Sequence, residues 1–231
     1  MGALVPRPAG VAPAEAAAYY EALPREGRLP GRCEMRLPDG LAGARVLDML
    51  CRAGKGAFKL ADAVGAQGFV LGCDPDAARM AAAERVRAQA AGRGEGWARR
   101  VAFRRAAPEL LADAGVERAS FDVVYVNASF NAAFRKDAVL RQALEALRPG
   151  GALWIAGVFA ASPLPALPPA GGSGNVFWCA WTFEQLSRAA QAAGFAGCVL
   201  LDAAPVEPDG ADADEALAQV SFVAGNARLV R

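Results

Sequence analysis

The chain contains no histidine, only three lysines, and five cysteines that form no C-x-x-C pair. Without histidine there can be no Ser-His-Asp or Cys-His catalytic set and no histidine-ligated metal. The scattered cysteines indicate neither a zinc knuckle nor a disulfide framework, and we interpret them as reduced thiols of a cytoplasmic protein. We expect no bound metal, and acid–base chemistry would fall to carboxylates, tyrosine or cysteine.

Excess charge and uninterrupted apolar runs are also missing. The 25 basic and 24 acidic residues nearly cancel, so we expect no general attraction to nucleic acid or to an anionic membrane. The first 20 residues lack the apolar core of a secretory signal. Residues 149–183 carry no charge, but prolines interrupt them, so we expect no membrane span.

Short apolar runs alternate with helical stretches through most of the 231 residues. Buried strands separated by helices are typical of a parallel sheet covered on both faces. We therefore predict an α/β, doubly wound, mostly parallel sheet of about seven strands, a Rossmann-like fold. The expected strands cover residues 44–50, 68–73, 101–104, 121–126, 152–159, 198–201 and 219–224, and the expected helices cover 54–64, 76–91, 136–147 and 182–193.

A short N-terminal extension precedes this sheet. The segment PAEAAAYYEAL predicts a helix over Pro13–Leu23, and residues 24–43 form a Pro- and Gly-rich connection. We divide the chain into residues 1–43 and a domain over residues 44–231.

The loop after the first strand and the end of the second strand are the first candidate site. Asp74 lies 20 residues after Gly54 (74 − 54), a spacing that suits a carboxylate that binds a ribose. It could equally cap the helix that begins near Asp76. The loop fits neither a P-loop nor a dinucleotide motif, because no earlier glycine precedes Gly54-Lys55 and Lys59 stands where a small residue is needed.

Several ordered segments give the chain a family resemblance: ARVLDMLCRAGKG, VLGCDPDAARM, AFRRAAPEL, FDVVYVNASFN, LRQALEALRPGGALWIAGVF and GNVFWCAWTFEQLSRAAQAAGF. Together they resemble the class I S-adenosylmethionine-dependent methyltransferases, most closely the arsenite methyltransferase-like small-molecule branch.

The resemblance implies S-adenosylmethionine as cofactor and a set of residues that bind it. Asp74 would contact the ribose, Pro75 and Glu109 would lie near the adenine, and the first loop would cradle the rest. The cofactor-binding residues it implies are Asp48, Arg52, Gly54, Asp74, Pro75, Glu109 and Asn127. Tyr19 and Tyr20 resemble a paired tyrosine of that branch, which suggests Tyr20 as a substrate contact, although both could instead form one face of a docking helix.

The first loop departs from the family pattern, because Leu50 and Arg52 occupy two glycine positions. If the loop keeps its path, each non-glycine residue there costs about 1–3 kcal/mol. The Arg52 guanidinium could pair with the carboxylate of the methionine moiety, fill the pocket, or turn to solvent.

The acceptor side departs as well. Family members hold a metalloid with cysteines, but NASFN has none and Val176 stands where a thiol is expected, with Cys179 three residues later. Cys51 and Cys73 would pack as small hydrophobes. The uncharged span over residues 162–181 suggests a loop over the cleft, or else a core edge or dimer contact. Its substrate-binding candidates are Phe177, Trp178, Cys179 and Trp181.

These patterns predict in-line methyl transfer to a small, apolar or soft nucleophilic acceptor, with alignment supplying most of the catalysis. No catalytic residue is assigned, although Tyr125, Glu184 and Cys179 are candidate proton acceptors. The alternative is a degenerate methyltransferase fold that binds a ligand or partner without turnover. We expect a small-molecule partner and consider a homodimer.

Overall fold

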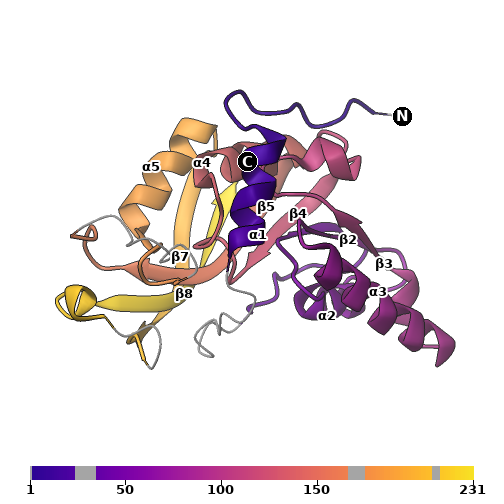
Figure 1. Ribbon diagram of the computed structural model, residues 1–231. Coiled ribbons are helices and arrows are strands. Elements are labelled where there is room, and N and C mark those ends of the chain that lie inside the picture. Colours follow the sequence, from indigo (N-terminus) through magenta and orange to yellow (C-terminus); the bar gives the residue numbers. More distant parts are fainter. Residues whose placement is uncertain (1, 24–34, 166–174, 210–213) are drawn as a thin grey trace.

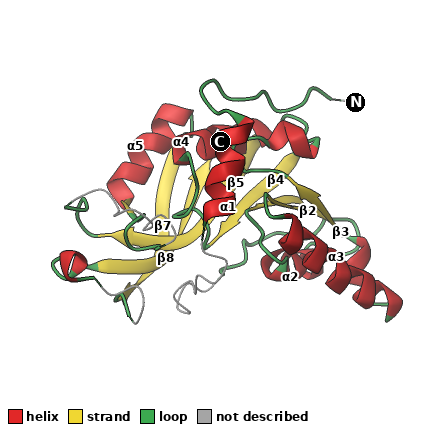
Figure 2. Ribbon diagram, in the orientation of Figure 1, coloured by secondary structure: helices red, strands yellow, loops and turns green. Residues whose placement is uncertain are grey.

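A computed structural model describes residues 2–23, 35–165, 175–209 and 214–231 (Figure 1). Part of the predicted connection (24–34) and part of the uncharged span (166–174) lie outside the described residues. The described residues form one mixed sheet with helices on both sides (Figure 2).

The sheet has the strand order β3-β2-β1-β4-β5-β8-β7, with a short β6 paired to β5. All strands that pair within β1 to β6 run parallel, whereas β8 runs antiparallel to both β5 and β7. This confirms the predicted doubly wound, mostly parallel architecture. The strands are β1 (Arg45–Met49), β2 (Phe69–Asp74), β3 (Val101–Arg105), β4 (Phe121–Asn127), β5 (Leu147–Ala160), β6 (Trp181–Thr182), β7 (Gly197–Val206) and β8 (Phe222–Val230).

The helices follow the predicted order, with end positions that shift by a few residues. They are α1 (Pro13–Ala22), α2 (Lys55–Ala63), α3 (Ala77–Gly92), α4 (Lys136–Ala146) and α5 (Phe183–Ala193), with 3-10 turns at Gly96–Arg99, Leu111–Ala114 and Glu215–Leu217. Three predictions of extent were wrong: β5 begins at Leu147 rather than residue 152, β7 runs to Val206 rather than residue 201, and β8 runs to Val230 rather than residue 224. Pairing between strands explains each extension: Leu147 pairs with Phe121 of β4, β8 pairs with β5 from Phe222 to Val230, and β7 pairs with β8 as far as Val206.

Side-chain alternation along β1 builds a core on each face of the sheet. Leu47 and Met49 join the larger core cluster, which includes buried residues of α4 and α5. Val46 points the other way, into a cluster built with α2. Asp48 follows Val46 at the strand period of two, which places its carboxylate on the α2 side of the sheet.

The N-terminal segment packs directly on the sheet domain. The Val5 N–H donates to the Val116 carbonyl at 2.9 Å, and the Gln142 side chain donates to the Pro6 carbonyl at 2.7 Å. In α1, the Tyr19 hydroxyl donates to the Ala132 carbonyl at 3.1 Å. Helix α1 is thereby fixed against the loop that follows β4.

A third, smaller core cluster lies beyond the ends of β5, β7 and β8. Phe177 is fully buried there, with its ring centroid 5.0 Å from that of Phe222. Trp178 is 5% exposed, and its Nε1 donates to Asp214 Oδ2 at 3.0 Å. Both side chains therefore occupy the core-edge position that we considered as the alternative to an acceptor surface.

No helix among the described residues has the length and apolar character needed to cross a membrane.

Replacing Phe177 by alanine should destabilise the protein by about 3–5 kcal/mol, because it removes a fully buried aromatic ring. Urea unfolding followed by circular dichroism measures this loss. As a control, Leu37→Ala removes a side chain that is 39% exposed and should change stability by less than about 0.5 kcal/mol. A loss below about 1 kcal/mol for Phe177→Ala would contradict its assignment to the core.

Candidate functional site

The loop after β1 keeps a left-handed path even without its usual glycines. Leu50 has a φ of 56°, Arg52 of 54° and Gly54 of 85°. Non-glycine residues adopt such angles only where the surroundings enforce them. Two hydrogen bonds to β2 do so here: the Cys51 N–H donates to the Cys73 carbonyl at 3.0 Å and the Arg52 N–H to Asp74 Oδ2 at 2.9 Å.

The side chains at the two replaced glycine positions point in different directions. Leu50 is 5% exposed and belongs to the larger core cluster, and its carbonyl accepts a hydrogen bond from the Ser129 hydroxyl. Arg52 is partly exposed. Burial, then the neighbouring Arg79, lowers the Arg52 pKa, while Asp74 opposes them. The guanidinium therefore lies at the β2 side of the loop.

Gly54, the remaining glycine of the loop, and Gly56, in the first turn of α2, both lie where a side chain would meet close neighbours. A Cβ on Gly54 would lie 2.8 Å from the Phe58 ring and 2.9 Å from the Phe103 ring. A Cβ on Gly56 would lie 3.2 Å from Asn127 Nδ2 and 3.3 Å from Asp48 Oδ2. The Gly56 backbone thus marks the point where Asp48 and Asn127 converge.

Asp48 is a fully buried carboxylate, and neither of its oxygens has a hydrogen-bond partner among the described residues. Burial, with a smaller contribution from the nearby Asp74, raises its pKa to about 8. A buried polar group without a partner is costly. Asp48 is therefore suited to bind a cationic or hydrogen-bonding ligand.

Asp74 is also fully buried, but its oxygens accept the N–H groups of Arg52 and Asp76, at 2.9 and 3.0 Å. Burial raises its pKa, and these hydrogen bonds and Arg79 oppose the rise. The cap of α3 is instead Asp76, which accepts the N–H groups of Ala78 and Arg79. The helix-cap alternative for Asp74 was therefore wrong.

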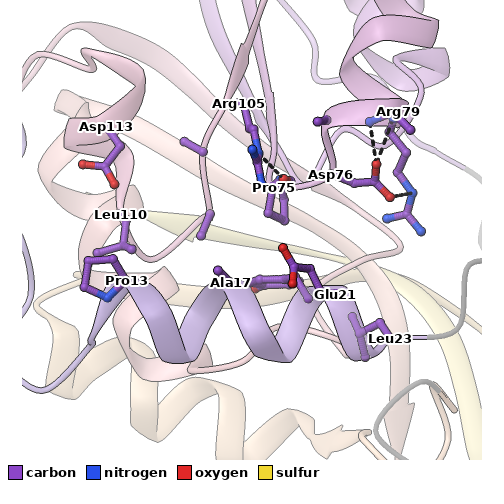
Figure 3. A pocket seen from close by; sticks show the side chains of 15 residues that line it. Pro13, Ala17, Glu21, Leu23, Pro75, Asp76, Arg79, Arg105, Leu110 and Asp113 are labelled. Atoms are coloured by element: carbon purple, nitrogen blue, oxygen red, sulfur yellow. Dashed lines mark hydrogen bonds and ion pairs between the residues drawn. The ribbon is translucent and has the colours of Figure 1, made fainter.

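A cavity of about 580 Å³ lies beside Pro75, where β2 and β3 end (Figure 3). Helix α1 forms one wall, and Pro75 and Arg105 lie opposite it. The Arg105 Nε donates to the Pro75 carbonyl at 2.8 Å, which ties the two strand ends together. The volume falls within the range of small-molecule sites.

Glu109 lies outside the lining of this cavity and is fully buried. It accepts hydrogen bonds from the Tyr20 hydroxyl at 3.0 Å and from the Arg135 N–H at 3.0 Å. Tyr20 in turn accepts from the Phe134 N–H at 3.2 Å and lines the cavity. Glu109 thus joins α1 to the loop after β4.

On the acceptor side, Trp181 and Cys179 lie near a residue that the sequence analysis missed. The Lys136 ammonium is 5.4 Å from the centroid of the Trp181 ring. Cys179 lies close enough to Lys136 and to Tyr19 to influence the pKa of each. The available signal was that Lys136, one of only three lysines, follows the loop after β4.

Among residues 2–23, 35–165, 175–209 and 214–231, no three acidic, cysteine or histidine side chains gather as metal ligands.

Residues 41–189 match a methyltransferase domain family. The chain belongs to the class I S-adenosylmethionine-dependent methyltransferases. S-adenosylmethionine is the cofactor of this family.

The relatives lie in the arsenite methyltransferase branch. An arsenite methyltransferase from Aquipseudomonas alcaligenes is 39% identical over 128 residues, which cover 55% of this chain and 36% of the relative. One from Mus musculus is 27% identical over 204 residues, 86% of this chain and 54% of the relative. The chain therefore spans about half or less of the length of these relatives.

A solved structure from the same branch shares the fold. It is an arsenic(III) S-adenosylmethionine methyltransferase from Chlamydomonas reinhardtii, with a TM-score of 0.77 and 26% identity. The match covers 98% of this chain and 74% of the other. The predicted family and fold are thus confirmed.

Replacing Asp48 by asparagine should change how stability depends on pH. An unfolded Asp ionises near pH 4, whereas folded Asp48 has a pKa of about 8. The folded state therefore holds one more proton between these values, and the wild type should lose about 1.4 kcal/mol per pH unit relative to the variant as the pH rises through this window. The difference should level off above pH 8.

Urea unfolding between pH 5 and pH 9 measures this slope. Asp62→Asn, which removes an exposed carboxylate from α2, is the matched control and should produce no relative slope. Parallel stability curves for the wild type and Asp48→Asn would show that Asp48 is ionised in the folded protein across the whole range.

Proposed function

We propose that this chain is an S-adenosylmethionine-dependent methyltransferase that acts on a small organic acceptor by in-line displacement. The observation that carries the proposal is the buried, unpartnered Asp48 carboxylate beside a left-handed first loop. The loop path is the one that glycine normally supports in this family, and here hydrogen bonds to β2 maintain it with Leu50 and Arg52 in place.

The described residues fit the charge and size of the cofactor. Asp48 and Asn127 converge on Gly56, so they are suited to bind the amino acid end, with Asp48 facing the ammonium group. Asp74 retains capacity for ribose hydroxyls, because a carboxylate has about four acceptor positions and two are occupied by N–H groups. The cavity beside Pro75 suits the adenine.

The bound cofactor would supply a methyl group attached to a positively charged sulfur. The sulfur is the leaving group, and its positive charge makes it a good one. The protein then needs to align the acceptor and exclude water rather than provide a strong base. Two predicted proton acceptors do not suit that role: Tyr125 is fully buried and donates to the Arg36 carbonyl, and Glu184 is an exposed partner of Arg188.

The described thiols argue for an acceptor other than a thiolate-bound metalloid. Burial raises the pKa of Cys51 and raises that of Cys73 to about 12, so both are protonated at neutral pH. No three cysteine, aspartate or glutamate side chains gather as a ligand set among the described residues. Cys179 is near Lys136, but burial raises its pKa as well. We therefore favour an organic acceptor.

Titration of the protein with S-adenosylmethionine at pH 6.5 should show binding that releases close to one proton. At that pH Asp48 is mostly protonated, and pairing with the ammonium group of the cofactor would ionise it. Calorimetry in two buffers with different ionisation enthalpies measures the number of protons released.

Asp48→Asn should abolish the proton release and weaken binding by about 10- to 100-fold, the usual effect of losing a charged hydrogen bond. Asp62→Asn should change neither quantity. Absence of heat with millimolar S-adenosylmethionine and with its demethylated product would refute the proposed function.

A further inference from the structure

Lys136 is more buried than the other two lysines of the chain. Lys55 and Lys59 are exposed, whereas Lys136 is partly buried at the first residue of α4. Its ammonium group lies 5.4 Å from the centroid of the Trp181 ring, a contact with the face of an aromatic system. Burial lowers its pKa.

The groups around Lys136 leave its charge without a carboxylate partner among the described residues. Asp137, the next residue, is paired with Arg135 and Arg141. The nearby Cys179 thiol is neutral at ordinary pH, because burial raises its pKa. The start of α4 adds partial positive charge. Within the described part of the chain, the Lys136 ammonium at this corner of the molecule therefore forms no ion pair, and the buried Glu109 carboxylate instead accepts the Arg135 N–H and the Tyr20 hydroxyl.

The same corner lies beside the proposed methyl-transfer site. Trp181 belongs to β6, which pairs with Phe159 and Ala160 at the carboxyl end of β5. Its ring meets that of Phe130 edge to face, with centroids 5.8 Å apart. Phe130 follows Asn127, the β4 residue that lies with Asp48 beside Gly56. Ligands of open α/β sheets bind at this edge.

We infer that Lys136 and Trp181 bind a negatively charged group of the methyl acceptor, and that the acceptor is a small aromatic carboxylate. One ammonium group matches a singly charged anion better than a phosphate dianion. The partly exposed Trp181 ring suits a flat apolar body. This inference rests on the proposed function, since it specifies the acceptor of the same reaction.

Competitive acetylation tests the inference, because the three lysines can be followed separately. The full chain is treated with limiting acetic anhydride, with and without benzoate as the probe, in the presence and absence of S-adenosylhomocysteine. Mass spectrometry then gives the acetylation rate of each lysine. Benzoate at ten times its dissociation constant should slow acetylation of Lys136 about tenfold. Lys55 and Lys59 should be unaffected.

Benzamide, which has the same ring without the charge, is the matched control ligand and should give no protection. The Trp181→Leu variant should lose protection by benzoate. In calorimetry, Lys136→Met should lose benzoate binding and Lys55→Met should retain it, while both still bind S-adenosylhomocysteine.

Equal protection by benzamide, or no protection while S-adenosylhomocysteine still binds, would overturn the inference and leave the proposed function intact. Failure of S-adenosylhomocysteine to bind would instead contradict the proposed function, and protection of Lys136 by benzoate under those conditions would identify a carboxylate site unconnected with methyl transfer.

Discussion

The hydrogen bond from the Arg52 N–H to the Asp74 carboxylate is the contact on which the site depends. It joins the loop after β1 to the end of β2 and holds Arg52 at a φ of 54°. A left-handed non-glycine residue costs about 1–3 kcal/mol, and a hydrogen bond to a charged acceptor contributes about 1.5–3 kcal/mol. The two magnitudes are similar, so the loop can retain its path after losing the glycine.

This arrangement gives Asp48 and Asp74 different chemistry although both are fully buried. Asp74 accepts two N–H groups and lies near Arg79, which favours its ionised form. Asp48 has no such partners, and the nearby Asp74 disfavours its ionisation. One carboxylate thus maintains the loop, and the other remains available to a positively charged ligand.

The sheet could be predicted because its signals are local. Apolar runs bounded by helical stretches indicated every long strand, and the spacing between Gly54 and Asp74 located the loop that faces the ligand edge. The ends of β5 and β8 could not be predicted in this way. The extent of β8 follows from its pairing with β5, from Ala152–Val230 to Ala160–Phe222, and the start of β5 follows from the pairing of Leu147 with Phe121 of β4. No local pattern reports either pairing.

The candidate site was predictable in its polar residues but less so in its aromatic ones. Asp48 is the second-last residue of β1 and Asp74 the last of β2, so their position near the carboxyl edge of the sheet follows from the fold. Trp178 and Trp181 belong to one uncharged segment, and the sequence does not distinguish them. The structure places Trp178 in a core cluster and Trp181 beside Lys136. The two side chains differ in position because Trp181 belongs to β6, which pairs with the end of β5.

Helix α1 links the cavity beside Pro75 to the start of α4. Tyr20 lines the cavity beside Pro75 and hydrogen-bonds Glu109, and Glu109 accepts the Arg135 N–H immediately before Lys136. A ligand that contacts Tyr20 in the cavity would therefore also act, through Glu109, on the start of α4. If the cavity beside Pro75 holds the nucleoside of the cofactor, as we propose, its occupation would restrict the position of the Lys136 ammonium, so cofactor and acceptor should bind with positive coupling.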